Sequence, residues 1–134
     1  MSLEDVLTKA VSTVPEAVAA GYIDLSSGML LGVKTVDSHP SEVMDLLAAA
    51  TTDLFRGTNV MMIEDMFKKA RGVKDTSHYF QEIIVNSENL VHIFICGKSN
   101  PEHVLTMVCR KSTNLGMALT KTRAIMPEME KAVA

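Results

Sequence analysis

Histidine and cysteine are the residue types in this sequence with the clearest potential for metal or thiol chemistry. His92 and Cys96 lie four residues apart in an apolar stretch, which would place both side chains on one face of a β-strand. Tetrahedral zinc sites usually combine two such closely spaced pairs of ligands. Because the chain's four histidines and two cysteines supply only this pair, the sequence predicts no metal site.

The two cysteines, Cys96 and Cys109, are poorly placed for a disulfide. If the turn at residues 97–101 joins adjacent strands, Cys96 pairs near His103 or Val104 and Cys109 near Val91. The sulfur atoms would then be separated by several residues along the ladder, beyond the Cα spacing of about 4.4–6.8 Å that a disulfide needs. Thiol catalysis would require an exposed, electropositive setting, and Cys109 falls in an apolar register. Two unpaired cysteines fit a reducing cytoplasm.

Phosphate-binding and acid–base motifs are also incomplete. Gly97-Lys98-Ser99 resembles the end of a P-loop, but position 92 is histidine where that motif needs glycine. The adjacent carboxylates Glu64 and Asp65 would diverge by about 100° on a helix. The sequence therefore predicts no catalytic residue and no cofactor site, and we expect a protein that is not an enzyme.

Composition limits the class of protein and its partners. The chain has 134 residues, a length typical of one domain, and we expect residues 1–134 to form it. A net charge of −3 argues against nucleic-acid binding. No apolar run reaches the roughly 18 residues of a membrane span. The N-terminus lacks a signal-peptide core, so we expect a cytoplasmic location.

Hydrophobic periodicity predicts an α+β fold with the order α-β-β-α(α)-β-β-β-α. A five-stranded antiparallel sheet with helices on both faces would bury every apolar face of these elements. A helix-start signal lies at residues 37–41, and the helical run after Gly57 either continues the preceding helix or begins a new one. The predicted helices span residues 3–13, 41–56, 63–72 and 114–134, and the strands residues 17–25, 29–36, 79–85, 90–96 and 104–110.

The predicted helix at residues 41–56 has two apolar stripes. One stripe is expected to cover the sheet, and it contains Val43, Leu46, Leu47, Ala50 and Leu54. The second stripe lies about 100° around the helix, and it contains Met44, Ala48, Thr51 and Phe55. Something else must cover the second stripe, either another subunit or the chain's own helical run at residues 63–70.

Three stretches resemble the roadblock/dynein light chain family, a branch of the profilin-like folds. The first is GYIDLSSGMLLG at residues 21–32, which matches the family's first hairpin. The second is the strand pair YFQEIIVNSENLVHIFI at residues 79–95, and the third is TNLGMALTKTRAIMPEME at residues 113–130, where the closing helix begins. The chain departs from the compact family plan in the long segment at residues 57–72.

This resemblance implies a homodimer, or a heterodimer with a relative, in which the central helices pack together and the third strands meet. The resemblance also implies a non-enzymatic module that binds a small Ras-like GTPase or a signalling or motility assembly. The alternative is a small-molecule sensor of related, PAS/GAF-like architecture, for which His92, Thr106 and Tyr22 are the candidate polar residues. The candidate dimer-interface residues are Met44, Ala48, Thr51, Phe55, Tyr79, Gln81 and Ile83.

Overall fold

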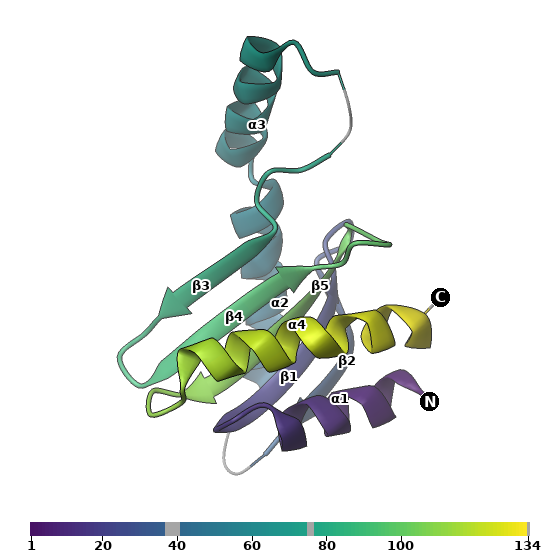
Figure 1. The fold of residues 1–134 in the computed structure, drawn as a ribbon, viewed down its shortest axis with the longest axis vertical. Helices are drawn as coiled ribbons and strands as arrows, with labels where there is room; N and C mark the ends of the chain where they lie inside the picture. The colour runs from purple at the N-terminus through teal and green to yellow at the C-terminus, as the bar shows by residue number, and fades with distance from the viewer. Residues whose placement is uncertain (37–40, 75–76, 134) are drawn as a thin grey trace.

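A computed structural model describes residues 1–36, 41–74 and 77–133 of the chain. Five antiparallel strands form one sheet in the order β2-β1-β5-β4-β3 (Figure 1). The strands are β1 (Ala17–Asp24), β2 (Met29–Thr35), β3 (Glu82–Asn86), β4 (Leu90–Cys96) and β5 (His103–Arg110), and the helices are α1 (Leu3–Thr13), α2 (Ser41–Arg56), α3 (Thr58–Arg71) and α4 (Leu115–Ala132). The predicted fold class and element order are confirmed.

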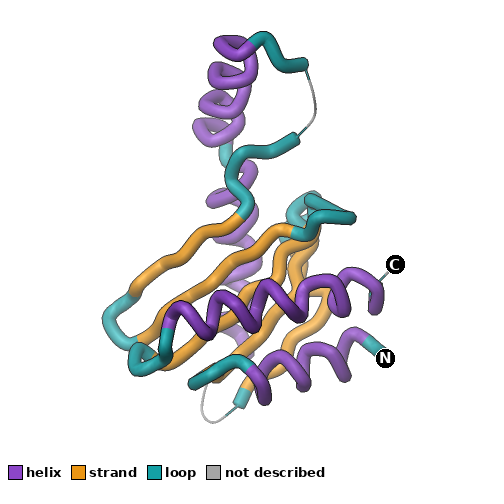
Figure 2. The backbone as a smooth tube through the Cα atoms, viewed as in Figure 1, coloured by secondary structure: helices purple, strands orange, loops and turns teal. Residues whose placement is uncertain are grey.

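The sheet is covered on both faces, as its doubly apolar central strands require. Helices α1 and α4 lie side by side on one face, and α2 lies behind the sheet (Figures 1 and 2). The core between α1, α4 and the sheet includes Leu7, Tyr22 and Met107, whereas the core beneath α2 includes Phe55 and Phe94. Strand β3 forms one edge of the sheet, and β2 forms the other.

The first hairpin forms where the Ser-Ser-Gly turn predicts it. Gly28 has a φ of 71°, a left-handed conformation that glycine adopts without steric cost. Gly32, in the returning strand, allows α1 to pack closely, because a Cβ there would lie 2.9 Å from side-chain atoms of Leu3 and Leu7. Ser2 caps α1 by accepting a hydrogen bond from the amide of Asp5 at 3.1 Å.

The helical run after Gly57 is a new helix, α3, and not a continuation of α2. Gly57 lies between the two helices with an extended backbone (φ −62°, ψ 157°), and its amide still donates to the carbonyl of Asp53. Figure 1 shows α3 projecting beyond the end of the sheet, away from both covered faces. Gly72 ends α3 in a left-handed conformation, as predicted. The helix-start signal at residues 37–40 lies outside the described residues.

Replacing Gly57 with alanine is expected to lower the free energy of unfolding by about 1–3 kcal/mol. A Cβ at this position would lie 2.5 Å from the carbonyl oxygen of Asp53, which is backbone and cannot rotate away. Urea unfolding of the purified variant measures this loss. Gly116→Ala is the matched control, because its Cβ would have ordinary contacts and the change favours the α4 helix. Equal stability of the two variants would contradict a constraint at the α2–α3 junction.

Candidate protein-interaction surface

Four residues of α2 predicted to contact another subunit are buried inside the chain itself. Met44, Ala48, Thr51 and Phe55 are each no more than 1% exposed, and we call them the inner stripe. Phe55 contacts Phe94 of β4 edge to face, with ring centroids 6.4 Å apart. Met44 reaches so close to β1 that a Cβ on Gly21 would lie 2.9 Å from its terminal methyl group. The prediction that these four residues form a dimer interface is therefore wrong.

The inner stripe packs on the sheet and not under the helical run at residues 63–70, so that alternative is also wrong. Its three apolar side chains belong to the two core clusters that include residues of β1, β4 and β5, such as Ile23, Phe94 and Val108. The physical reason is that both stripes of α2 are apolar enough to cover a sheet. Periodicity shows that a face is buried but does not show against which surface.

Most of the other stripe of α2, predicted to lie on the sheet, faces outward instead, and only Leu47 is half-buried and packs against the core as predicted. Leu46 is 76% exposed, and Val43 and Leu54 are also substantially exposed. On the opposite flank of α2, Thr52 and Arg56 donate hydrogen bonds to the carbonyls of Leu25 and Pro101. The exposed stripe therefore lies on the flank of α2 nearer β3. We call its four exposed residues, Val43, Leu46, Ala50 and Leu54, the outer stripe.

Strand β3 forms an edge of the sheet beside this stripe. Among the described strands it pairs only with β4, so one row of its backbone N–H and C=O groups faces away from the sheet. Ile84 and Val85 are each more than one-third exposed. An unpaired, apolar edge is an association hazard unless another chain covers it. The outer stripe and β3 are both exposed and apolar, and together they are the candidate surface for a protein partner.

The three predicted interface residues around β3 have different positions. Ile83 lies in the strand and packs partly against the core beneath α2. Gln81 precedes the strand, is exposed, and its side-chain amide donates to the carbonyl of His78. Tyr79 lies further back, against Phe67 of α3 with ring centroids 5.6 Å apart. The expected strand at residues 79–85 thus begins three residues later, and a role of these residues in an interface stays a prediction.

The buried carboxylate of Glu64 links α3 to the segment that precedes β3. Glu64 is 1% exposed, and its carboxylate oxygens accept hydrogen bonds from the backbone amide of Tyr79 and contact Nδ1 of His78 at 3.0 Å. Arg71 donates to the Tyr79 hydroxyl at 2.8 Å. Sequence reasoning correctly separated Glu64 from Asp65 but missed this pairing. Its signal is a glutamate next to the apolar face of a helix, which needs a buried polar partner.

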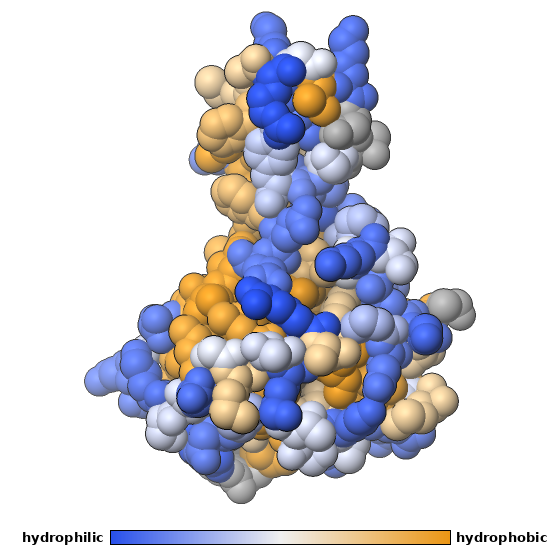
Figure 3. Space-filling model, viewed as in Figure 1, coloured by the Kyte–Doolittle hydropathy of each residue, from blue (hydrophilic) through white to orange (hydrophobic). Residues whose placement is uncertain are grey.

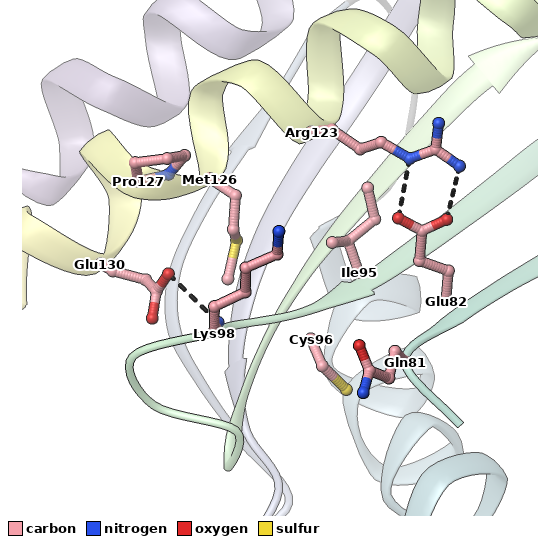
Figure 4. Close-up of a pocket in the computed structure, with 9 residues that line it drawn as sticks. All are labelled: Gln81, Glu82, Ile95, Cys96, Lys98, Arg123, Met126, Pro127 and Glu130. Carbon is pink, nitrogen blue, oxygen red and sulfur yellow. Dashed lines mark hydrogen bonds and ion pairs between the residues drawn. The ribbon is translucent and has the colours of Figure 1, made fainter. Parts of the chain in front are cut away.

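A hollow of about 160 Å³ lies between the start of β3, the end of β4 and α4 (Figure 4). Its carboxylates and its guanidinium group are already paired within the chain. Arg123 forms two hydrogen bonds with Glu82, at 2.8 and 2.6 Å, and this pairing lowers the pKa of the Glu82 carboxyl. Glu130 accepts hydrogen bonds from the amides of Lys98, Ser99 and Asn100. The hollow thus has a mixed lining, in which Ile95, Met126 and Pro127 are the apolar part and the acidic groups are held by hydrogen bonds.

The residues proposed for a small-molecule sensor do not converge. Tyr22 lies in the core beneath α1 and α4, where burial raises its pKa. His92 and Thr106 lie on the opposite face of the sheet. The ring of His92 stacks with that of Phe94, and Thr106 is the residue of β5 that pairs with Phe94. None of the three lines the hollow beside α4. The hydroxyls of Tyr22 and Thr106 are buried without a hydrogen-bond partner among the described residues, but they lie on opposite faces of the sheet and therefore do not form one binding site.

The cysteines lie on opposite faces of the sheet. Cys96 pairs with Val104, and Cys109 pairs with Val91, which confirms the predicted register. Burial raises the pKa of both thiols to about 11, so the reactive thiolate is disfavoured near neutral pH. In the described part of the chain, no group of three or more His, Cys, Asp or Glu side chains is placed to hold a metal ion. No helix there combines the length and apolarity that crossing a membrane requires.

Comparison with known proteins identifies the fold. No protein-family model matches the sequence, and no curated protein matches it. Comparison of structures shows that the chain has the roadblock fold, as its three motif stretches predicted. A roadblock/LC7 domain from Streptomyces avermitilis superposes with a TM-score of 0.70 at 11% identity, covering 99% of this chain and 98% of that one.

Two MglB structures are similar to the same extent. Myxococcus xanthus MglB has a TM-score of 0.69 and 16% identity, over 96% of this chain and 92% of its own. The MglB described as a gliding protein from Thermus thermophilus has a TM-score of 0.69 and 18% identity, over 96% of this chain and 85% of its own. At these identities the likeness concerns the fold.

Proposed function

We propose that this protein is a non-enzymatic, dimeric interaction module that binds a small Ras-like GTPase or a signalling or motility assembly. The observation that carries the dimer is the apolar surface formed by the outer stripe of α2 and the unpaired edge of β3. Two copies related by a two-fold axis could pair their β3 edges and pack their α2 helices against each other. That arrangement would cover both exposed features at once.

The size of this surface suits an interface between subunits. Specific interfaces bury about 1,600 Å² in total, and two helices with a strand pair can supply such an area. The outer stripe is aliphatic, with two leucines, a valine and an alanine, and such a core is typical of homodimers. The resemblance to roadblock proteins supports the same arrangement. It also supports the GTPase partner, because prokaryotic members of that family are associated with small GTPases.

Sedimentation of the wild-type protein over a range of concentrations tests the dimer. We expect a dimer at micromolar concentration that dissociates on dilution. A protein that remains monomeric at about 100 μM, where even weak dimers associate, would contradict the proposal. For the partner, immobilised protein is incubated with purified small GTPases loaded with GDP or with a GTP analogue. Retention of none of them in either state would exclude the GTPase as partner.

A further inference from the structure

Helix α3 has an apolar face that its own chain leaves exposed. Met66 is 70% exposed, Met62 57% and Ile63 41%, although all three lie on one arc of a projecting helix. The contacts of Glu64 and Phe67 with residues 78 and 79 fix the orientation of α3 from another side. A rigidly held helix with exposed methionines is a favourable docking surface, because methionine adapts to its partner.

This apolar face is continuous with the surface proposed for the dimer. Figure 3 shows apolar colouring along one side of the molecule, from the projecting helix towards the part of the body where Figure 1 places β3. The exposed apolar residues involved belong to α3, the end of α2 and β3, and they include Met62, Met66, Leu54, Ile84 and Val85. A partner that covered β3 would thus also approach the base of α3.

Strand geometry determines which part of a second copy would meet α3. In a two-fold antiparallel pair of β3 strands, the start of one strand lies beside the end of the other. Residue Glu82 begins β3 at the end of the sheet from which α3 projects, and Asn86 ends it at the opposite end. The β3–β4 turn at residues 87–89 of the partner subunit would therefore lie next to α3.

One pair of opposite charges supports the same contact. The C-terminal end of α3 and the residues after it are basic, since Lys68, Lys69, Arg71 and Lys74 occur within seven residues, and Lys69 and Lys74 are exposed. The β3–β4 turn has an exposed carboxylate, Glu88, and the ammonium of Lys111 donates to the carbonyl of Ser87 in the same turn, so the contact would be made by Glu88 itself and not by an acidic surface. Opposite charges across an interface help to fix its register.

We propose that α3 is an arm that packs over the β3–β4 turn of a second copy of this chain. The arm's methionines would cover apolar surface beside the paired β3 strands, and its lysines would approach Glu88 of the partner subunit. This inference rests on the proposed dimer and assigns to it a second, separate contact. Each two-fold dimer would contain two such arms, one at each end of the joined sheets.

Sedimentation equilibrium of Met66→Asp tests the arm. We expect its dimer dissociation constant to rise at least about tenfold, because the substitution would bury a charge at both arm contacts. Met117→Asp is the matched control, since Met117 is 50% exposed on α4, and its dissociation constant should stay within about twofold of wild type. Circular dichroism of both variants checks that the fold is retained.

Zero-length carboxyl–amine cross-linking of a mixture of ¹⁴N- and ¹⁵N-labelled protein provides the second measurement. We expect mixed-isotope cross-links between Glu88 and Lys69 or Lys74, and their loss in Glu88→Gln. A wild-type dimer whose dissociation constant is unchanged by Met66→Asp, or that gives no such mixed-isotope cross-link, would overturn the arm while leaving the dimer intact. A monomeric wild type would overturn both.

Discussion

Replacing Leu46 with aspartate is expected to raise the dimer dissociation constant about 100-fold or more, because the charge would enter the centre of the interface twice. Leu46 is 76% exposed in the single chain, so its substitution removes little that holds the subunit together. The free energy of unfolding, measured by urea at a concentration where the protein is monomeric, should change by less than about 0.5 kcal/mol. The expected result is a folded monomer.

The matched control for Leu46→Asp is the same substitution at Leu31. Leu31 is 44% exposed on β2, at the edge of the sheet opposite β3. Sedimentation should show Leu31→Asp dimerising like the wild type. If both variants dissociate equally, the effect comes from added charge and not from the outer stripe. If neither dissociates, the outer stripe is not in the interface and the proposed arrangement of α2 helices is wrong.

The sequence predicts the two stripes of α2 correctly but reverses their roles, except that Leu47 packs towards the sheet as predicted. Both stripes repeat at helical spacing, and both consist of residues that a sheet or a second helix would accept. What decides between them is shape. Met44 fits over Gly21, where β1 has no side chain, and Phe55 fits against the ring of Phe94. The spacing of apolar residues along one helix does not reveal such contacts with residues of other elements.

The strands and turns were more predictable, because their signals are local. Gly28 and the polar residues before it mark the hairpin, and the registers of Cys96 and Cys109 followed from the length of one turn. The start of β3 was placed too early because Tyr79 and Phe80 are aromatic residues, a type enriched in strands. In the structure Tyr79 contacts α3 instead, since it packs on Phe67 and its amide donates to Glu64. The residue types of a segment do not reveal contacts with a helix that projects from the sheet.

Replacing Phe55 with alanine is expected to lower the free energy of unfolding by about 3–5 kcal/mol, among the largest effects of a single substitution. Phe55 is fully buried on the side of α2 that faces the sheet, and its ring contacts the ring of Phe94. Truncation removes apolar area and leaves a cavity that the sheet beneath it can fill only in part. Urea or thermal unfolding measures the loss. Phe55→Leu keeps most of the volume and should cost less than about 1.5 kcal/mol, so it remains measurable even if the alanine variant does not fold.

Phe67→Ala is the matched control for the Phe55 variants, since Phe67 is 52% exposed on α3 and contacts Tyr79 on one side only. Its loss of stability should be well below that of Phe55→Ala, because half of its side chain is already in water in the folded state.

The two stripes of α2 should differ in what their variants lose, stability or association. Inner-stripe variants should lose stability before they lose association, and outer-stripe variants should lose association alone. A Phe55→Ala protein that keeps its stability but no longer dimerises would mean that the inner stripe faces the partner after all.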